Sequence, residues 1–147
     1  MRIRAVAILI EADKVAVIER HLGGRLYFTF PGGGVDKGET VEQAVIREVD
    51  EELGLRVVVE RKVAEIWFRG NRQEYFLVHT ISGEFGSGTG EEYKSYRPEH
   101  GTYLPQMMPI TDVLIHPVLP TAMAELVFKS QTERWPPNPV IIFEEEK

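Results

Sequence analysis

A run of three glycines, residues 32–34, constrains this chain more than any other feature of its sequence. It follows Pro31 and a short aromatic-rich segment, residues 26–30, which predicts a strand. Proline and glycine in succession are expected to interrupt both helix and regular sheet. The strand should therefore end at a bend whose backbone lies open to whatever approaches it.

A helix over residues 40–53 is predicted shortly after this bend. Thr40 followed by Gln43 is the pattern of a capping box, in which each side chain accepts a hydrogen bond from the other residue's backbone. Gly54 can take the left-handed conformation that commonly ends a helix. The apolar positions expected to face the core are Val41, Val45, Ile46, Val49 and Leu53, with Ala44 at the edge of their arc.

Three glutamates, Glu48, Glu51 and Glu52, converge on one patch of this helix because they are spaced three or four residues apart. Asp50 adds a fourth carboxylate, and Arg47 is the only opposing charge in the same two turns. A hard cation such as Mg²⁺ or Mn²⁺ would relieve the repulsion between these groups. Acidic residues also gather on solvated helix faces, so the cluster alone leaves both interpretations open.

Composition limits the classes of protein to which the chain can belong. Its 147 residues predict a single domain, residues 1–147, and the lack of cysteine excludes disulfides and thiolate chemistry. A formal net charge of −6 argues against binding to a nucleic-acid backbone. The longest apolar run, residues 5–10, is too short to span a membrane, and the N-terminus lacks a signal-peptide pattern. We therefore expect a cytoplasmic protein without membrane association.

The remaining segments predict a mixed α+β domain. A hairpin is expected over residues 5–18, and residues 83–101 predict a long functional loop. The other predicted elements are strands at 55–59, 63–68, 75–81 and 102–104, and helices at 110–115 and 121–130. Residues 140–143 are interpreted either as an edge strand or as the contact of a homodimer.

The residues from Gly33 to Leu55 resemble the signature of the MutT-like Nudix hydrolase family. That signature reads Gly, five residues, Glu, seven residues, then Arg-Glu-aliphatic-x-Glu-Glu-x-Gly-aliphatic, and the chain matches it throughout. Average residue usage makes a chance match in one window on the order of one in a billion. The resemblance favours a metal site over a solvated helix face.

This resemblance implies a fold, an activity and a cofactor. The fold would be the Nudix fold, a mixed β-sheet sandwiched between α-helices. The activity would be hydrolysis of a pyrophosphate bond in a nucleoside diphosphate linked to another moiety, as in a nucleoside triphosphate, oxidised or not, or in ADP-ribose. The cofactor would be Mg²⁺ or Mn²⁺. The implied metal-binding residues are Gly32, Glu39, Glu48, Glu51 and Glu52, and the implied catalytic residues are Arg47, Glu48, Glu51 and Glu52.

The general base has two candidate sources. Glu48 lies at the centre of the helical cluster, whereas Glu91, Glu92 and Glu99 lie in or beside the long loop and could supply a base or an extra ligand. Any one loop acid is more often simply solvated. The number of metal ions is equally open.

Candidate substrate contacts are Arg25, Tyr27, Phe28 and Gly33. Tyr27 and Phe28 alternate across a strand, so one could stack on a base while the other packs inside. A small nucleotide is the expected partner. The alternative to an enzyme is a Nudix-fold module that binds a nucleotide without hydrolysing it, although such proteins usually lose signature glutamates and none is missing here.

Overall fold

The computed structural model describes residues 2–68, 70–88 and 101–144 of the chain. One mixed sheet runs in the spatial order β8-β3-β2-β1-β6-β5-β9, with β4 paired to β1 and β7 paired to β2. The elements are β1 (Ile3–Glu11), β2 (Lys14–Leu22), β3 (Arg25–Thr29), β4 (Gly32–Gly34), α1 (Val41–Leu53), β5 (Leu55–Phe68), β6 (Asn71–Gly83), β7 (Leu104–Pro109), η2 (Ile110–Asp112), β8 (Val118–Leu119), α3 (Thr121–Lys129) and β9 (Val140–Phe143).

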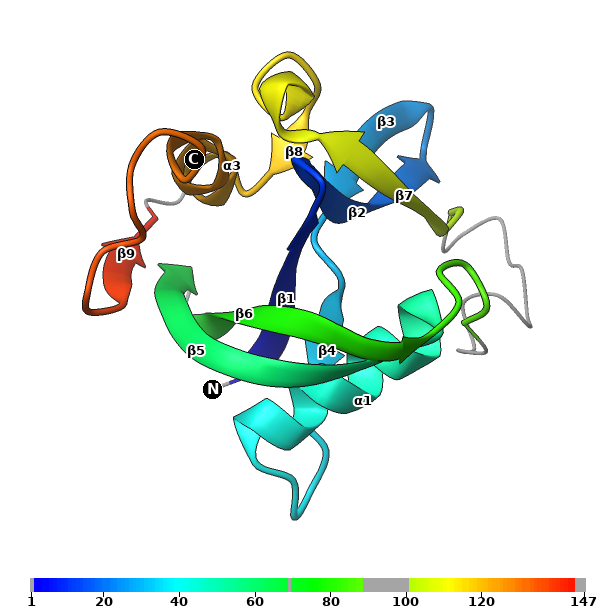
Figure 1. Cartoon of the computed structure of the whole chain (residues 1–147), viewed down its shortest axis with the longest axis vertical. Helices are drawn as coiled ribbons and strands as arrows, with labels where there is room; N and C mark the ends of the chain where they lie inside the picture. Colours follow the sequence, from blue (N-terminus) through cyan, green and yellow to red (C-terminus); the bar gives the residue numbers. More distant parts are fainter. Residues whose placement is uncertain (1, 69, 89–100, 145–147) are drawn as a thin grey trace.

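Strand β1 is central to the sheet and is buried on both faces. Alternate residues of a strand point to opposite faces, so Ala5 and Leu9 pack with α1 in one core while Val6 and Ile8 pack with α3 in the other. Figure 1 shows α1 and α3 on different sides of the curled sheet. The expected sandwich of sheet between helices is therefore the observed architecture.

The glycine run departs from its prediction, because residues 32–34 form strand β4 rather than a break in the sheet. β4 pairs antiparallel with β1, and Gly33 lies opposite Ala5. A Cβ atom on Gly32 would lie 2.8 Å from Val6 Cα. The missing side chains thus allow the close approach to β1.

The predicted hairpin over residues 5–18 is confirmed, and Ala12 and Asp13 form its turn with positive φ angles of 49° and 62°. The separate strands predicted at 55–59 and 63–68 are wrong. They form one strand, β5, which bulges at three places along its antiparallel pairing with β6. The bulges carry the strand through a polar stretch that interrupts the apolar pattern.

The predicted helix α1 is confirmed together with its caps. Gln43 N–H donates to Thr40 Oγ1 at 3.0 Å, and Thr40 N–H donates to Gln43 Oε1 at 2.8 Å. Gly54 ends the helix at a φ of 76°. Ile46 was expected in the core and is instead 38% exposed.

Two predictions in the second half need correction, and one strand was not foreseen. The strand expected at 102–104 is β7, at Leu104–Pro109, and the helix expected at 110–115 is the single turn η2. β8 was not predicted, whereas α3 and the edge strand β9 were. Most of the predicted long loop, residues 89–100, lies outside the described residues. No helix in the described parts is both long and apolar enough to cross a membrane.

Candidate active site

Arg47 is the centre of the acidic cluster on α1. Its Nε lies 2.7 Å from Glu39 Oε2, and its Nη1 donates to Glu48 Oε1 at 2.9 Å and to Glu51 Oε2 at 3.2 Å. Its Nη2 donates to the Gly34 carbonyl at 3.0 Å, which ties α1 to β4. One guanidinium therefore orients three of the signature glutamates and joins them to the glycine strand.

This arrangement favours the charged forms of both partners. The hydrogen bond to Glu39 raises the pKa of Arg47 above its already high ordinary value. Hydrogen bonds from Arg47, and then from the Asp36 backbone N–H, hold the pKa of Glu39 below its ordinary value. Glu39 is therefore a permanent anion at neutral pH.

Gly33 leaves the space that the Glu48 carboxylate occupies. A Cβ atom on Gly33 would lie 2.6 Å from Glu48 Cδ, so only glycine leaves room for this carboxylate. The side chain of Glu48 is 13% exposed. The glycine of the signature and its first clustered glutamate thus pack directly against each other.

Glu52 contacts strand β4 at Gly32, the residue before Gly33. The Gly32 N–H donates to Glu52 Oε2 at 2.9 Å, and Glu52 is only 7% exposed. Glu48 and Glu52 therefore flank the Gly32–Gly33 backbone with two carboxylates.

The residues after β6 pack against the C-terminal end of α1. Gly86 N–H donates to the Leu53 carbonyl at 2.9 Å, and a Cβ atom on Gly88 would lie 2.6 Å from the carbonyl carbon of Glu52. The loop candidates for the general base, Glu91, Glu92 and Glu99, lie outside the described residues.

Carboxylate and backbone carbonyl oxygens are the donors that Mg²⁺ and Mn²⁺ prefer. The side chains of Glu48, Glu51 and Glu52 and the Gly32 carbonyl supply such donors at one end of β4. Within residues 2–68, 70–88 and 101–144, however, no three Asp, Glu or His side chains form a group that could hold a metal ion. In this structure Glu39, Glu48 and Glu51 each accept a hydrogen bond from Arg47 instead.

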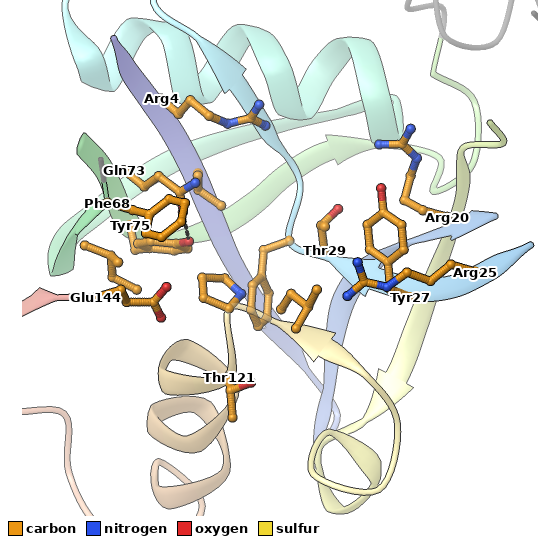
Figure 2. Close-up of a pocket in the computed structure, with 15 residues that line it drawn as sticks. Arg4, Arg20, Arg25, Tyr27, Thr29, Phe68, Gln73, Tyr75, Thr121 and Glu144 are labelled. Carbon is orange, nitrogen blue, oxygen red and sulfur yellow. Dashed lines mark hydrogen bonds between the residues drawn. The ribbon is translucent and has the colours of Figure 1, made fainter. Parts of the chain in front are cut away.

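A cavity of about 990 Å³ opens on the α3 side of the sheet. Arg4 links it to the signature residues, since Arg4 lines the cavity and its Nη2 lies 3.4 Å from the Gly32 carbonyl. Figure 2 shows Arg20, Arg25 and Tyr27 on one side of the cavity and Phe68, Gln73, Tyr75 and Glu144 on the other. The cavity is large enough for a nucleotide.

Of the four candidate substrate contacts, two line the cavity and two do not. Arg25 and Tyr27 line the cavity, and the Arg25 guanidinium lies 5.2 Å from the centre of the Tyr27 ring. Phe28 belongs to the hydrophobic core and is 4% exposed, so its assignment as a substrate contact is corrected to a core position. Gly33 packs on Glu48 rather than lining the cavity.

Several cavity residues were not foreseen from the sequence: Arg4, Arg20, Phe68, Gln73, Tyr75, Thr121 and Glu144. The period-two spacing of Gln73 and Tyr75 on β6 places them on one face, and this signal could have paired them. No local pattern marks Arg4 or Glu144. They reach the cavity only because β1 and β9 lie on opposite sides of the β5–β6 pair.

Comparison with known proteins identifies the family. A family model described as NUDIX domain matches residues 1–127. This chain belongs to the Nudix family. The match takes in the signature, the sheet around it and most of α3, so the Nudix resemblance of the sequence is confirmed.

Two Nudix relatives illustrate how far the similarity extends. An 8-oxo-dGTP diphosphatase from Proteus vulgaris is 45% identical over 40 residues, which are 27% of this chain and 34% of that protein. An RNA pyrophosphohydrolase from Teredinibacter turnerae is 31% identical over 81 residues, 43% of this chain and 47% of that protein. The matches thus span less than half of the length of either relative.

Solved Nudix structures match the whole described fold. An ADP-ribose pyrophosphatase from Streptococcus suis has a TM-score of 0.66 at 20% identity and covers 97% of this chain and 98% of its own. A Nudix hydrolase from Nitrosomonas europaea has a TM-score of 0.74 at 16% identity, and the match covers 99% of this chain and 79% of that protein. Likeness at these identities shows the fold and confirms the predicted Nudix sandwich.

Proposed function

We propose that this protein is a metal-dependent pyrophosphohydrolase that cleaves a pyrophosphate bond in a nucleoside diphosphate linked to another moiety. The observation that carries the proposal is the set of signature carboxylates. Arg47 orients Glu39, Glu48 and Glu51, and Glu52 accepts a hydrogen bond from the Gly32 N–H. The substrates named for the relatives, 8-oxo-dGTP, RNA and ADP-ribose, all belong to this class or carry its linkage.

Nudix hydrolases generally use divalent metals. In this chain Glu48, Glu51, Glu52 and the Gly32 carbonyl would hold Mg²⁺ or Mn²⁺, and Glu39 would support them through Arg47. When bound, the metal would neutralise pyrophosphate charge and lower the pKa of the attacking water.

The protein's own residues would position the substrate. Arg47 holds Glu39, Glu48 and Glu51 by hydrogen bonds, and Glu48 and Glu51 would turn part of their carboxylate oxygens from it toward a bound ion. Arg4 lies between the Gly32 carbonyl and the cavity, where it can pair with a phosphate oxygen. Arg25 and Tyr27 would contact the substrate at the far rim. Glu48 or one of the loop acids Glu91, Glu92 and Glu99 would accept the proton of the attacking water.

A panel assay tests the proposal. Purified protein is incubated with nucleoside triphosphates, oxidised dGTP, ADP-ribose and a 5′-triphosphorylated RNA, each with Mg²⁺, with Mn²⁺ and with a chelator, and the products are identified by mass. We expect metal-dependent cleavage between two phosphorus atoms of at least one compound. A protein that a nucleotide stabilises against heat but that releases no product from any of them would instead be the non-catalytic binding module.

A further inference from the structure

The wall of the cavity opposite Arg20 and Arg25 carries hydrogen-bond donors and acceptors. Gln73 and Tyr75 project into it from β6, and Phe68 and Glu144 project from the ends of β5 and β9 (Figure 2). Phe68 is 37% exposed and Tyr75 is 1% exposed. The wall therefore combines the exposed ring of Phe68, on which a planar base can stack, with one amide and one carboxylate.

The amide of Gln73 has a fixed orientation. The Tyr75 hydroxyl donates to Gln73 Oε1 at 2.5 Å. Burial raises the pKa of the Tyr75 hydroxyl well above its ordinary value, so it stays a donor at every working pH. Because the amide oxygen is engaged in this way, Gln73 presents its NH₂ group to a ligand.

Glu144 is positioned by the end of β9, whereas Gln73 lies on β6. The backbone N–H of Glu144 donates to the Trp67 carbonyl at 2.9 Å, which holds the end of β9 against β5. The Glu144 side chain lines the same cavity as Tyr75, on the side of Tyr75 away from Gln73 (Figure 2). Gln73 and Glu144 therefore approach one ring site on the two sides of Tyr75, one as a donor and the other as a double acceptor.

We infer that this wall binds guanine in preference to adenine, with Gln73 donating to O6 and Glu144 accepting from N1–H and the 2-amino group. The inference deepens the proposed function, on which it rests, by naming the base of the substrate. Guanine presents one acceptor followed by two donors along this edge, which complements the donor and two acceptors of the wall. Adenine presents a donor at its 6-amino group and an acceptor at N1, so a donor would face the Gln73 NH₂ group and neither carboxylate oxygen of Glu144 would find a donor.

The arginines of the cavity favour one orientation of the bound nucleotide, with its base at Glu144 and its phosphates at the arginines. Arg20 and Arg25 stand across the cavity from Glu144, and Arg4 lies toward α1 (Figure 2). A base at the Glu144 side directs the phosphates toward these cations and toward the signature residues. The reverse orientation would place phosphates against a carboxylate.

The test compares kcat/KM for GTP, ITP and ATP in the intact protein and in Glu144→Gln, with Glu133→Gln as the control. ITP keeps O6 and N1–H but lacks the 2-amino group, and Glu133 is an exposed glutamate outside the cavity. We expect the order GTP, ITP, ATP, with GTP at least about tenfold above ATP. Glu144→Gln should lower the GTP value about tenfold while the ATP value stays within about threefold. Glu133→Gln should behave like the parent.

A binding measurement separates this inference from the proposed function. The rise in melting temperature with GMP, IMP and AMP needs no turnover and should follow the same order. If no nucleotide is hydrolysed but GMP stabilises the parent more than AMP and Glu144→Gln abolishes the difference, the proposed function fails and the base assignment stands. Equal values for GTP and ATP, or a preference for GTP that Glu144→Gln leaves intact, would overturn the base assignment.

Discussion

Gly33 links the sequence signature to the geometry of the site more directly than any other residue. Gly33→Ala should push the Glu48 carboxylate aside, because the added Cβ would lie 2.6 Å from Glu48 Cδ. The side chain can yield, so the fold should survive, whereas displacing a catalytic group by about 1 Å costs about 100-fold in rate. We therefore expect kcat to fall about 100-fold with a small change in melting temperature.

Gly34→Ala is the matched control for this substitution. A Cβ atom on Gly34 meets only Arg2 Nη2, at 3.9 Å, and its φ is not positive. The Gly34 carbonyl that accepts from Arg47 is unchanged by the substitution. Similar turnover by the two alanine variants would contradict the packing of Glu48 on Gly33.

Glu39 gives the site a dependence of stability on pH. Its pKa is lowered in the folded protein from the ordinary value of 4.5, chiefly by hydrogen bonds from Arg47. The contribution of ionised Glu39 to the stability of the fold is therefore complete above pH 4.5. It is lost as the pH falls through the lowered pKa of the folded protein. The melting temperature should fall more steeply between about pH 5 and pH 3 in the parent than in Glu39→Gln. Parallel curves would show that the Arg47–Glu39 pair does not stabilise the fold.

At the scale of the element, the capping box should account for a measurable part of the stability of α1. Thr40→Ala removes the hydroxyl that accepts from Gln43 N–H and should lower the free energy of unfolding by about 1 kcal/mol. Thr40→Ser keeps the hydroxyl and is the control. Urea denaturation of the three proteins measures the difference, and equal midpoints for the alanine and serine variants would contradict the role of the cap.

Helix α1 could be predicted because its signals are local. Its caps and its acidic cluster follow from the spacing of residues within four positions of each other. The burial of Ile46 was predicted wrongly because the helix packs through an arc that includes Glu52, which is 7% exposed, while Ile46 is 38% exposed. The polar backbone of β4 makes a carboxylate acceptable there, since Gly32 N–H donates to Glu52.

The errors in the strands have a different cause. Strand β4 exists because β1 offers it a partner, and β5 continues through its polar middle because β6 runs beside it. Neither partner can be identified from the sequence around the strand itself. Pairing across the sheet therefore overrides local signals that are reliable for helices.

At the scale of the whole molecule, the acidic site was predictable and the cavity was not. Arg4, Gln73 and Glu144 come from β1, β6 and the end of β9, and only the assembled sheet brings them to one cavity. The charges are also segregated, because three arginines line the cavity of a chain whose net charge is −6. The signature carboxylates lie on α1 beside β4, where a bound metal ion would separate them from the phosphates.

A homodimer through residues 140–143 stays a prediction. β9 forms the edge of the sheet, and Ile141 and Phe143 are 58% and 73% exposed. Light scattering of the parent should give twice the chain mass of 16.8 kDa, and Ile141→Asp should return it to a single chain. A parent protein of 16.8 kDa at high concentration would exclude this dimer.

The most direct test of the central claim compares the parent protein with Glu52→Gln on its best substrate from the panel. Glutamine keeps an oxygen that accepts from Gly32 N–H, so the fold should be retained, but it removes the negative charge proposed to hold the metal. We expect metal-dependent pyrophosphate cleavage by the parent and a loss of at least about 100-fold in kcat for the variant, at an unchanged melting temperature. Equal turnover by the two proteins would contradict the assignment of the active site.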